Sequence, residues 1–135
     1  MFQAYSNNTT TYTQNTPVTF STIKYSNCRV KDTSGTAFRI SAPGNYLVSF
    51  SGIGASGTAT SVFSVQLYKD GVALPETATS ITSVAANDVG TLNFSTIVRV
   101  LPSCAMVNNT ASLQVIVTSE VSGTLTNPDI IIVRI

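Results

Sequence analysis

The chain contains no histidine and no tryptophan, and only 10% of its 135 residues carry a charge. Without histidine, no imidazole can act as the general base that activates a serine or cysteine nucleophile. Cys28 and Cys104 are the only cysteines, so the four Cys or His ligands of a structural zinc site are missing. These absences predict a protein that is not an enzyme and that holds no metal and no cofactor.

The few charges are also spread out. Seven basic and six acidic residues leave a net charge of +1, and the basic residues form no cluster along the chain. Binding to nucleic acid requires clustered lysines and arginines that neutralise several phosphates. The longest apolar run, residues 130–133, is far too short to span a bilayer, and the first ten residues lack the features of a signal peptide. We therefore expect no nucleic acid and no membrane among the partners, and assembly in a cytoplasm.

Carboxylates are the remaining groups that could act in catalysis or bind a metal. The chain has six of them: Asp32, Asp70, Glu76, Asp88, Glu120 and Asp129. Two carboxylates brought together by strands could serve glycoside hydrolysis, and several could bind calcium. However, the chain has no D-x-D-x-D-G loop, and Asp70 and Asp88 stand in turn sequences, where the side chain bonds the backbone two residues further on. The turn interpretation is favoured over both kinds of site.

Apolar and polar residues alternate from about residue 17 onward, and no stretch has the spacing of an amphipathic helix. The alternation predicts inward faces formed by Tyr46, Val48 and Phe50; by Phe63, Val65 and Leu67; by Leu92, Phe94, Val98 and Val100; and by Leu113, Val115 and Val117. Asp70-Gly71 predicts a hairpin with a type I′ turn. The fold class is therefore all-β: a two-sheet antiparallel jelly-roll sandwich of about eight to ten strands. It forms a single domain over residues 1–135, in which residues 1–16 are interpreted as an extended N-terminal arm that frays or docks only on assembly.

The last strand of the sequence is apolar on both of its faces. Ile130 and Ile132 point one way, while Ile131, Val133 and Ile135 point the other, so the strand is expected to be buried on both faces. In a two-sheet sandwich only one face of a strand meets the core of its own chain. The other face must then be covered by another subunit. The predicted subunit interface consists of Tyr46, Ile97, Ile130, Ile131, Ile132, Val133 and Ile135.

Four segments carry a resemblance to a known family: PVTF at 17–20, AFRISAPGNYLVSF at 37–50, VQLYKDGVALP at 65–75, and the closing IIIVRI. They resemble the jelly-roll heads shared by the first complement component, tumour necrosis factor and the collagen-like glycoprotein of bacillus spores. The resemblance implies a homotrimer closed around a threefold axis. It does not extend to a collagen-like stalk or to the Gly-Asp before the seventh strand, so calcium binding and vertebrate receptor binding are not implied.

The start Met-Phe-Gln and the QLYKDG hairpin also resemble small structural proteins of bacteriophages of Gram-positive hosts. We therefore expect a trimeric, surface-displayed structural protein, either a phage head fibre or a capsid decoration protein. Its expected location is the virion, and its expected partners are its own copies and capsid or other virion proteins. The alternative is a receptor- or glycan-binding tip of a phage fibre or of a bacterial cell or spore surface protein, which would bind through loops at the trimer apex.

The two cysteines leave two interpretations open. They form a disulfide within or between subunits, or they are reduced thiols in or near the core, as cytoplasmic synthesis favours. We predict that replacing both Cys28 and Cys104 with serine leaves assembly and the melting midpoint unchanged, because a chain of this length can bury a core without a covalent staple. Thermal denaturation in non-reducing buffer tests this. A loss of assembly or of most of the thermal stability would show that a disulfide holds the structure.

Overall fold

The computed structural model describes residues 1–26, 28–101 and 110–135. These residues form twelve strands and one short 3-10 helix: β1 (Phe2–Tyr5), β2 (Thr9–Tyr12), β3 (Thr22–Tyr25), β4 (Val30–Asp32), β5 (Phe38–Ile40), β6 (Gly44–Ser56), β7 (Ser61–Lys69), β8 (Val72–Ala73), η1 (Pro75–Thr77), β9 (Thr79–Ser83), β10 (Val89–Val100), β11 (Ala111–Val117) and β12 (Gly123–Arg134). The strand count exceeds the expected eight to ten because β2, β3, β4 and β8 are only two to four residues long. Segments that short give no clear alternation in the sequence.

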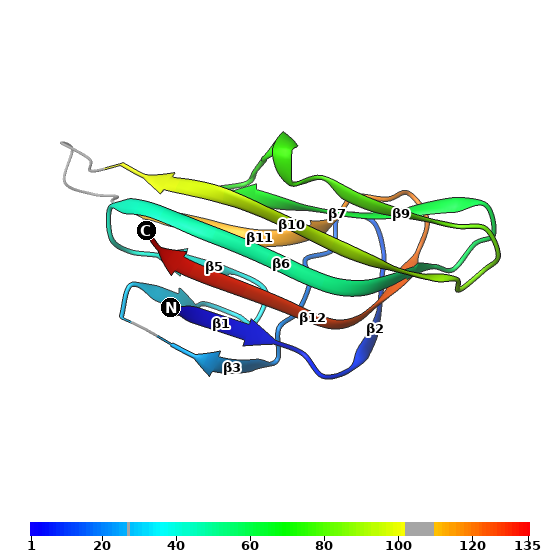
Figure 1. Cartoon of the computed structure of the whole chain (residues 1–135), viewed down its shortest axis with the longest axis horizontal. Coiled ribbons are helices and arrows are strands. Elements are labelled where there is room, and N and C mark those ends of the chain that lie inside the picture. The colour runs from blue at the N-terminus through cyan, green and yellow to red at the C-terminus, as the bar shows by residue number, and fades with distance from the viewer. Residues whose placement is uncertain (27, 102–109) are drawn as a thin grey trace.

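The strands form two six-stranded antiparallel sheets, which confirms the predicted sandwich (Figure 1). Sheet A has the order β10-β6-β12-β1-β3, and β2 pairs with the first part of β12. Sheet B has the order β4-β5-β11-β7-β8, and β9 pairs with β7. In Figure 1 sheet A lies in front of sheet B, with its outer face toward the viewer.

The core lies between the two sheets and is joined by a chain of phenylalanine rings. Phe50 of β6 stacks on Phe94 of β10 with ring centroids 5.2 Å apart, and Phe20 meets Phe50 edge to face at 6.3 Å. Phe20 and Phe2 both lie against Phe38 of sheet B, at 5.4 and 5.2 Å. Aromatic pairs in such geometries stabilise a core beyond the burial of their area. The residues predicted to point inward on β6, β7, β10 and β11 are all buried.

The predicted hairpin turn at Asp70-Gly71 is also confirmed. Lys69 pairs with Val72, and both residues between them have positive φ, 51° for Asp70 and 82° for Gly71, as a type I′ turn requires. The Asp70 carboxylate, however, accepts its hydrogen bond from the backbone N–H of Ser112 at 2.9 Å, and not from a residue two positions along the turn. The side chain therefore ties the hairpin to β11.

The interpretation of residues 1–16 as an extended arm is wrong. β1 lies inside sheet A, paired with β12 on one side and β3 on the other, and Phe2 and Ala4 are buried. β2 extends the pairing along β12. With only two inward positions in β1, the alternation is too short to distinguish a core strand from a polar arm.

Sheet A packs tightly against sheet B at Gly123, the first residue of β12. A Cβ placed on Gly123 would collide with the ring of Phe63 and the carbonyl oxygen of Ala55. The absence of a side chain is therefore what lets the buried Phe63 ring pack against the backbone of β12.

We predict that Gly123→Ala lowers the free energy of unfolding by about 1–3 kcal/mol, the usual cost of overpacking a core. Urea denaturation measures the change. Gly71→Asn is the control, because a Cβ there meets nothing within 4 Å and asparagine tolerates positive φ, so its cost should stay below about 1 kcal/mol. Equal losses of unfolding free energy in both variants would show that steric crowding is not the reason for glycine at position 123.

Candidate functional site

The outer face of sheet A carries an apolar row that the described residues leave partly exposed. Pairing in register places Ile97 of β10 beside Leu47 of β6, and Leu47 beside Val133 of β12. In the isolated chain Ile97 is 58% exposed, Leu47 is 37% exposed and Val133 is half-buried. These three residues, which we call the apolar row, present large side chains to solvent across three adjacent strands.

Neighbouring positions extend this surface. The next row along the strands holds Ser95, Ser49 and the half-buried Ile131, and Ile53 lies further along β6 with 43% of its surface exposed. At the other side of the apolar row, Ile135 donates its backbone N–H to Asn45 O at 2.9 Å and so continues the pairing of β12 with β6. The apolar part of the outer face therefore lies over β10, β6 and the second half of β12.

The seven residues predicted for an interface fall into two groups. Tyr46, Ile130 and Ile132 are buried in the core of the protomer, so their side chains are not on the surface where another subunit could reach them. Ile97, Ile131, Val133 and Ile135 lie on the outer side of sheet A or at its end, half-buried or exposed. The protomer therefore buries one face of the last strand by itself, and the burial of the other face by another subunit stays a prediction.

Two residues of this surface, Leu47 and Ile53, were not among the predicted seven. They stand on the otherwise polar side of β6, where they interrupt the series Asn45, Ser49 and Ser51. An apolar residue on the solvent side of an alternating strand is the available sequence signal. It is weak, because isolated exposed apolar residues are common on protein surfaces.

The carboxylates of Asp32 and Asp88 accept hydrogen bonds from the backbone of their own turns. Asp32 accepts the backbone N–H groups of Ser34 and Gly35 at 3.0 and 2.6 Å, and Asp88 accepts that of Ala85, three residues before it, at 2.9 Å. Within the described residues there is no group of three His, Cys, Asp or Glu side chains that could hold a metal ion. In the same part of the chain no helix has the length and hydropathy to cross a membrane.

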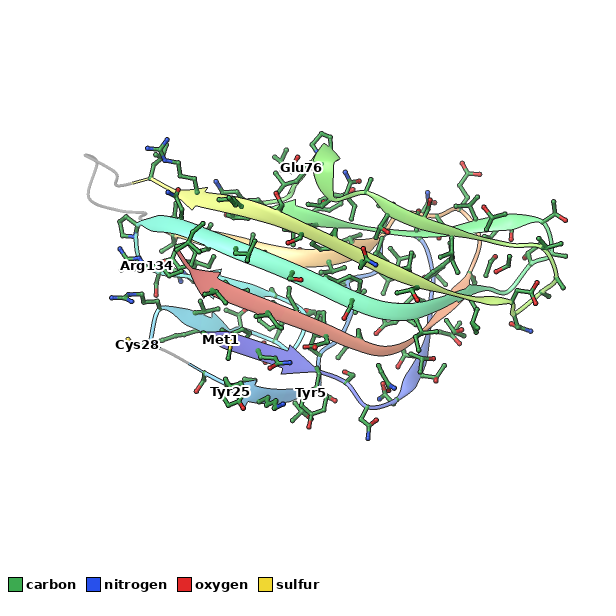
Figure 2. All side chains as sticks on the ribbon, in the orientation of Figure 1. Met1, Tyr5, Tyr25, Cys28, Glu76 and Arg134 are labelled. Carbon is green, nitrogen blue, oxygen red and sulfur yellow. The ribbon has the colours of Figure 1, made fainter. Side chains whose placement is uncertain are left out.

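Cys28 does not lie in the core. It is exposed, in the turn before β4, near Met1 and Arg134 (Figure 2). The expectation of a thiol in or near the core is therefore not met for Cys28, which lies at the surface beside the last residues of β12. Cys104 lies outside the described residues.

The other half of the outer face is polar and hollowed. A pocket of about 370 Å³ opens over β1, β3 and the middle of β12. It is lined by Gln3, Tyr5, Ser6, Asn7, Lys24, Asn127 and Asp129. The outer face of sheet A is thus divided into an apolar half and a polar half, and we call the hollow in the latter the polar pocket.

This arrangement of two antiparallel sheets matches the jelly-roll folds of tumour necrosis factor and C1q heads. The chain is similar to the Eiger TNF of S. frugiperda, with a TM-score of 0.72 and 12% identity over 99% of this chain and 92% of that one. It is similar to the globular domain of zebrafish complement 1qA, with a TM-score of 0.63 and 12% identity over 94% and 92%. For murine APRIL the TM-score is 0.54, with 8% identity over 93% and 98%.

At such identities the likeness shows the fold. No family model matches the sequence, and no curated protein matches it. The resemblance of the sequence segments to TNF and complement heads is therefore confirmed at the level of the fold. Function depends on the surfaces that this chain carries on the fold.

We predict that Tyr46→Phe lowers the free energy of unfolding by about 1 kcal/mol and leaves the assembly state unchanged. The buried Tyr46 hydroxyl donates a hydrogen bond to Ala42 O at 2.7 Å, and losing one such bond costs about that amount. Urea denaturation and sedimentation velocity measure the two effects. A change in sedimentation without a loss of stability would place Tyr46 at a subunit contact after all.

Proposed function

We propose that this protein is a non-enzymatic structural protein whose protomers form a homotrimer through the apolar half of the outer face of sheet A. The trimer is displayed on the surface of a particle, as a bacteriophage head fibre or capsid decoration protein. Its partners are its own copies and capsid or other virion proteins.

The apolar row is the observation that carries this proposal. Ile97, Leu47 and Val133 form one continuous strip across three paired strands, and the adjacent row of Ser95, Ser49 and Ile131 adds no charge. Burying apolar area stabilises an assembly by about 25 cal/mol per Å². A contiguous exposed apolar surface on a chain with so few charges is typical of an interaction site.

The chemistry of these rows suits contact between identical copies. Near a rotation axis each side chain lies close to its own symmetry mates, so a charged residue there would meet the same charge. The rows that contain Ile97 and Ser95 hold no charged residue on β10, β6 or β12. Cyclic closure also gives a finite assembly, whereas an unclosed contact would grow into a fibre. The resemblance to complement and TNF heads favours threefold closure.

A non-enzymatic role is supported by the side chains available for catalysis. The chain has no histidine, and Asp32 and Asp88 bond the backbone of their own turns. Asp70 binds the N–H of Ser112 in the neighbouring strand. Carboxylates used in this way stabilise turns and do not form a catalytic pair.

The assignment to a phage particle rests on the resemblance of the QLYKDG hairpin and the first residues to small phage structural proteins. Immunogold labelling tests it on particles released by the cells that carry the gene. Gold on phage heads is the expected result. Gold confined to the bacterial cell or spore surface would contradict the phage role and favour the alternative location.

We predict that the wild type sediments as a trimer at micromolar concentration, and that Ile97→Asp and Ile131→Asp sediment as folded monomers. Burying an uncompensated carboxylate is costly enough to weaken each contact by at least about a hundredfold. Analytical ultracentrifugation and circular dichroism are the measurements.

Val62→Asp is the matched control. Val62 is 45% exposed but lies on β7 of sheet B, so the same charge there should leave the trimer intact. A wild-type monomer at micromolar concentration, or equal dissociation by the control, would overturn the proposed interface.

A further inference from the structure

We propose that the polar pocket binds a neutral pyranose sugar of a glycan, with the ring of Tyr5 as the stacking surface and the Gln3–Asp129 pair as the hydrogen-bonding group. This goes beyond the proposed structural role and uses the other half of the same face. The pocket lies in the range of 300–1,000 Å³ that is typical of small-ligand sites.

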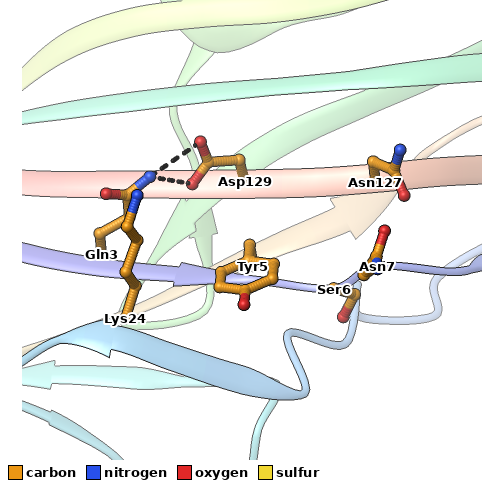
Figure 3. Close-up of a pocket in the computed structure, with 7 residues that line it drawn as sticks. All are labelled: Gln3, Tyr5, Ser6, Asn7, Lys24, Asn127 and Asp129. Carbon is orange, nitrogen blue, oxygen red and sulfur yellow. Dashed lines mark hydrogen bonds between the residues drawn. The ribbon is translucent and has the colours of Figure 1, made fainter.

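The lining residues surround Tyr5 (Figure 3). Gln3 and Lys24 lie on one side of the tyrosine, and Ser6 and Asn7 lie on the other. Asn127 and Asp129, on the adjacent strand β12, complete the wall. Tyr5 is half-buried, so its position is fixed by the sheet while part of its surface remains open to a ligand.

The side chains of Gln3 and Asp129 are held in place by hydrogen bonds to each other. Gln3 Nε2 donates to both carboxylate oxygens of Asp129, at 3.1 Å each, across 126 positions of sequence. A carboxylate has about four acceptor sites, and the glutamine amide has a carbonyl oxygen besides its donor nitrogen. Asp129 therefore keeps acceptor capacity toward the pocket. Two neighbouring hydroxyl groups of a sugar ring are the donors that match a fixed carboxylate.

The ring of Tyr5 matches the apolar face of a sugar. The C–H groups of a pyranose form an apolar patch with slight positive charge, and an aromatic ring has a negative face. Lys24, on the edge strand β3, also lines the pocket, and its ammonium group is a hydrogen-bond donor at the rim.

The backbone of β12 is irregular where it forms one wall of the polar pocket. The pairing of β12 with β6 shifts register between Thr126 and Asp129, and Asn127 adopts a positive φ of 51°. Its N–H donates to Asn8 O at 3.0 Å, and Ser6 N–H donates to Pro128 O at the same distance. A bulge of this kind redirects side chains, and here it brings Asn127 and Asp129 to one pocket.

The charges select among ligand classes. Lys24 and Asp129 together give the lining no net charge, which favours a neutral ligand, and a single carboxylate is too few to bind a divalent cation, which takes several oxygen ligands. A second copy of the chain is better matched by the apolar row, which lies across β10, β6 and the end of β12. A neutral polyhydroxylated ring satisfies both the tyrosine and the amide–carboxylate pair.

Saturation-transfer difference NMR on the full chain tests the site, with the methyl glycosides of glucose, galactose, mannose and N-acetylglucosamine as probes and galacturonate as the acidic comparison. We expect at least one neutral glycoside to receive saturation, strongest on the ring protons of one sugar face. Asp129→Asn should weaken its affinity at least about tenfold, because a charge-assisted bond becomes a neutral one. Tyr5→Leu should abolish the one-sided pattern.

Asn93→Ala is the matched control, since Asn93 is exposed on the same face but outside the pocket, and it should bind as the wild type does. No transfer to any neutral glycoside, transfer to galacturonate alone, or an unchanged affinity in Asp129→Asn would each overturn the site. Ile97→Asp separates this proposal from the trimer, because a monomer should still bind the sugar. If Ile97→Asp bound the sugar and the wild type did not, a second copy would cover the pocket in the trimer. That result would also overturn the site.

Discussion

The central position of β12 in sheet A is the constraint on which the rest of the structure depends. This strand pairs with β6 along one edge, and with β2 and then β1 along the other. Its alternation sends Ile130 and Ile132 into the core, where both are buried, and Ile131 and Val133 to the outer face. Because a strand side chain can occupy only one face, the apolar outer residues are fixed by the same register that builds the core. Any shift of β12 by one residue would exchange the two sets.

The same pairing forms both candidate surfaces. On the β6 side, β12 brings Val133 into line with Leu47 and Ile97. On the β1 side it brings Asp129 opposite Tyr5 and within hydrogen-bond distance of Gln3. The apolar row and the Gln3, Tyr5 and Asp129 side chains of the polar pocket all stand on paired strands. Side chains on such elements are held more precisely than side chains on loops.

The sequence predicts which residues of a strand face inward, but not which strands become neighbours. The inward sets on β6, β7, β10 and β11 follow from alternation alone, and the Asp70-Gly71 turn follows from its requirement for positive φ. The apolar row could not be predicted as a row, because Leu47, Ile97 and Val133 belong to three distant segments that only the sheet order joins. The polar pocket was hidden for the same reason. Its first strand was also too short to be recognised, and Gln3 and Asp129 are separated by 126 positions.

The division of one sheet face into an apolar half and a polar half has a physical basis in the partners that each half can contact. An apolar row can pack against a copy of itself without penalty, because no charge is brought near an identical charge. A half-buried carboxylate such as Asp129 cannot do so unless a cation or hydrogen-bond donors accompany it. Gln3 supplies part of that compensation from within the chain, and Lys24 lines the same hollow. The remaining acceptor capacity of Asp129 suits this hollow to water or to a ligand rich in hydroxyl groups, whereas the apolar row suits contact between identical copies.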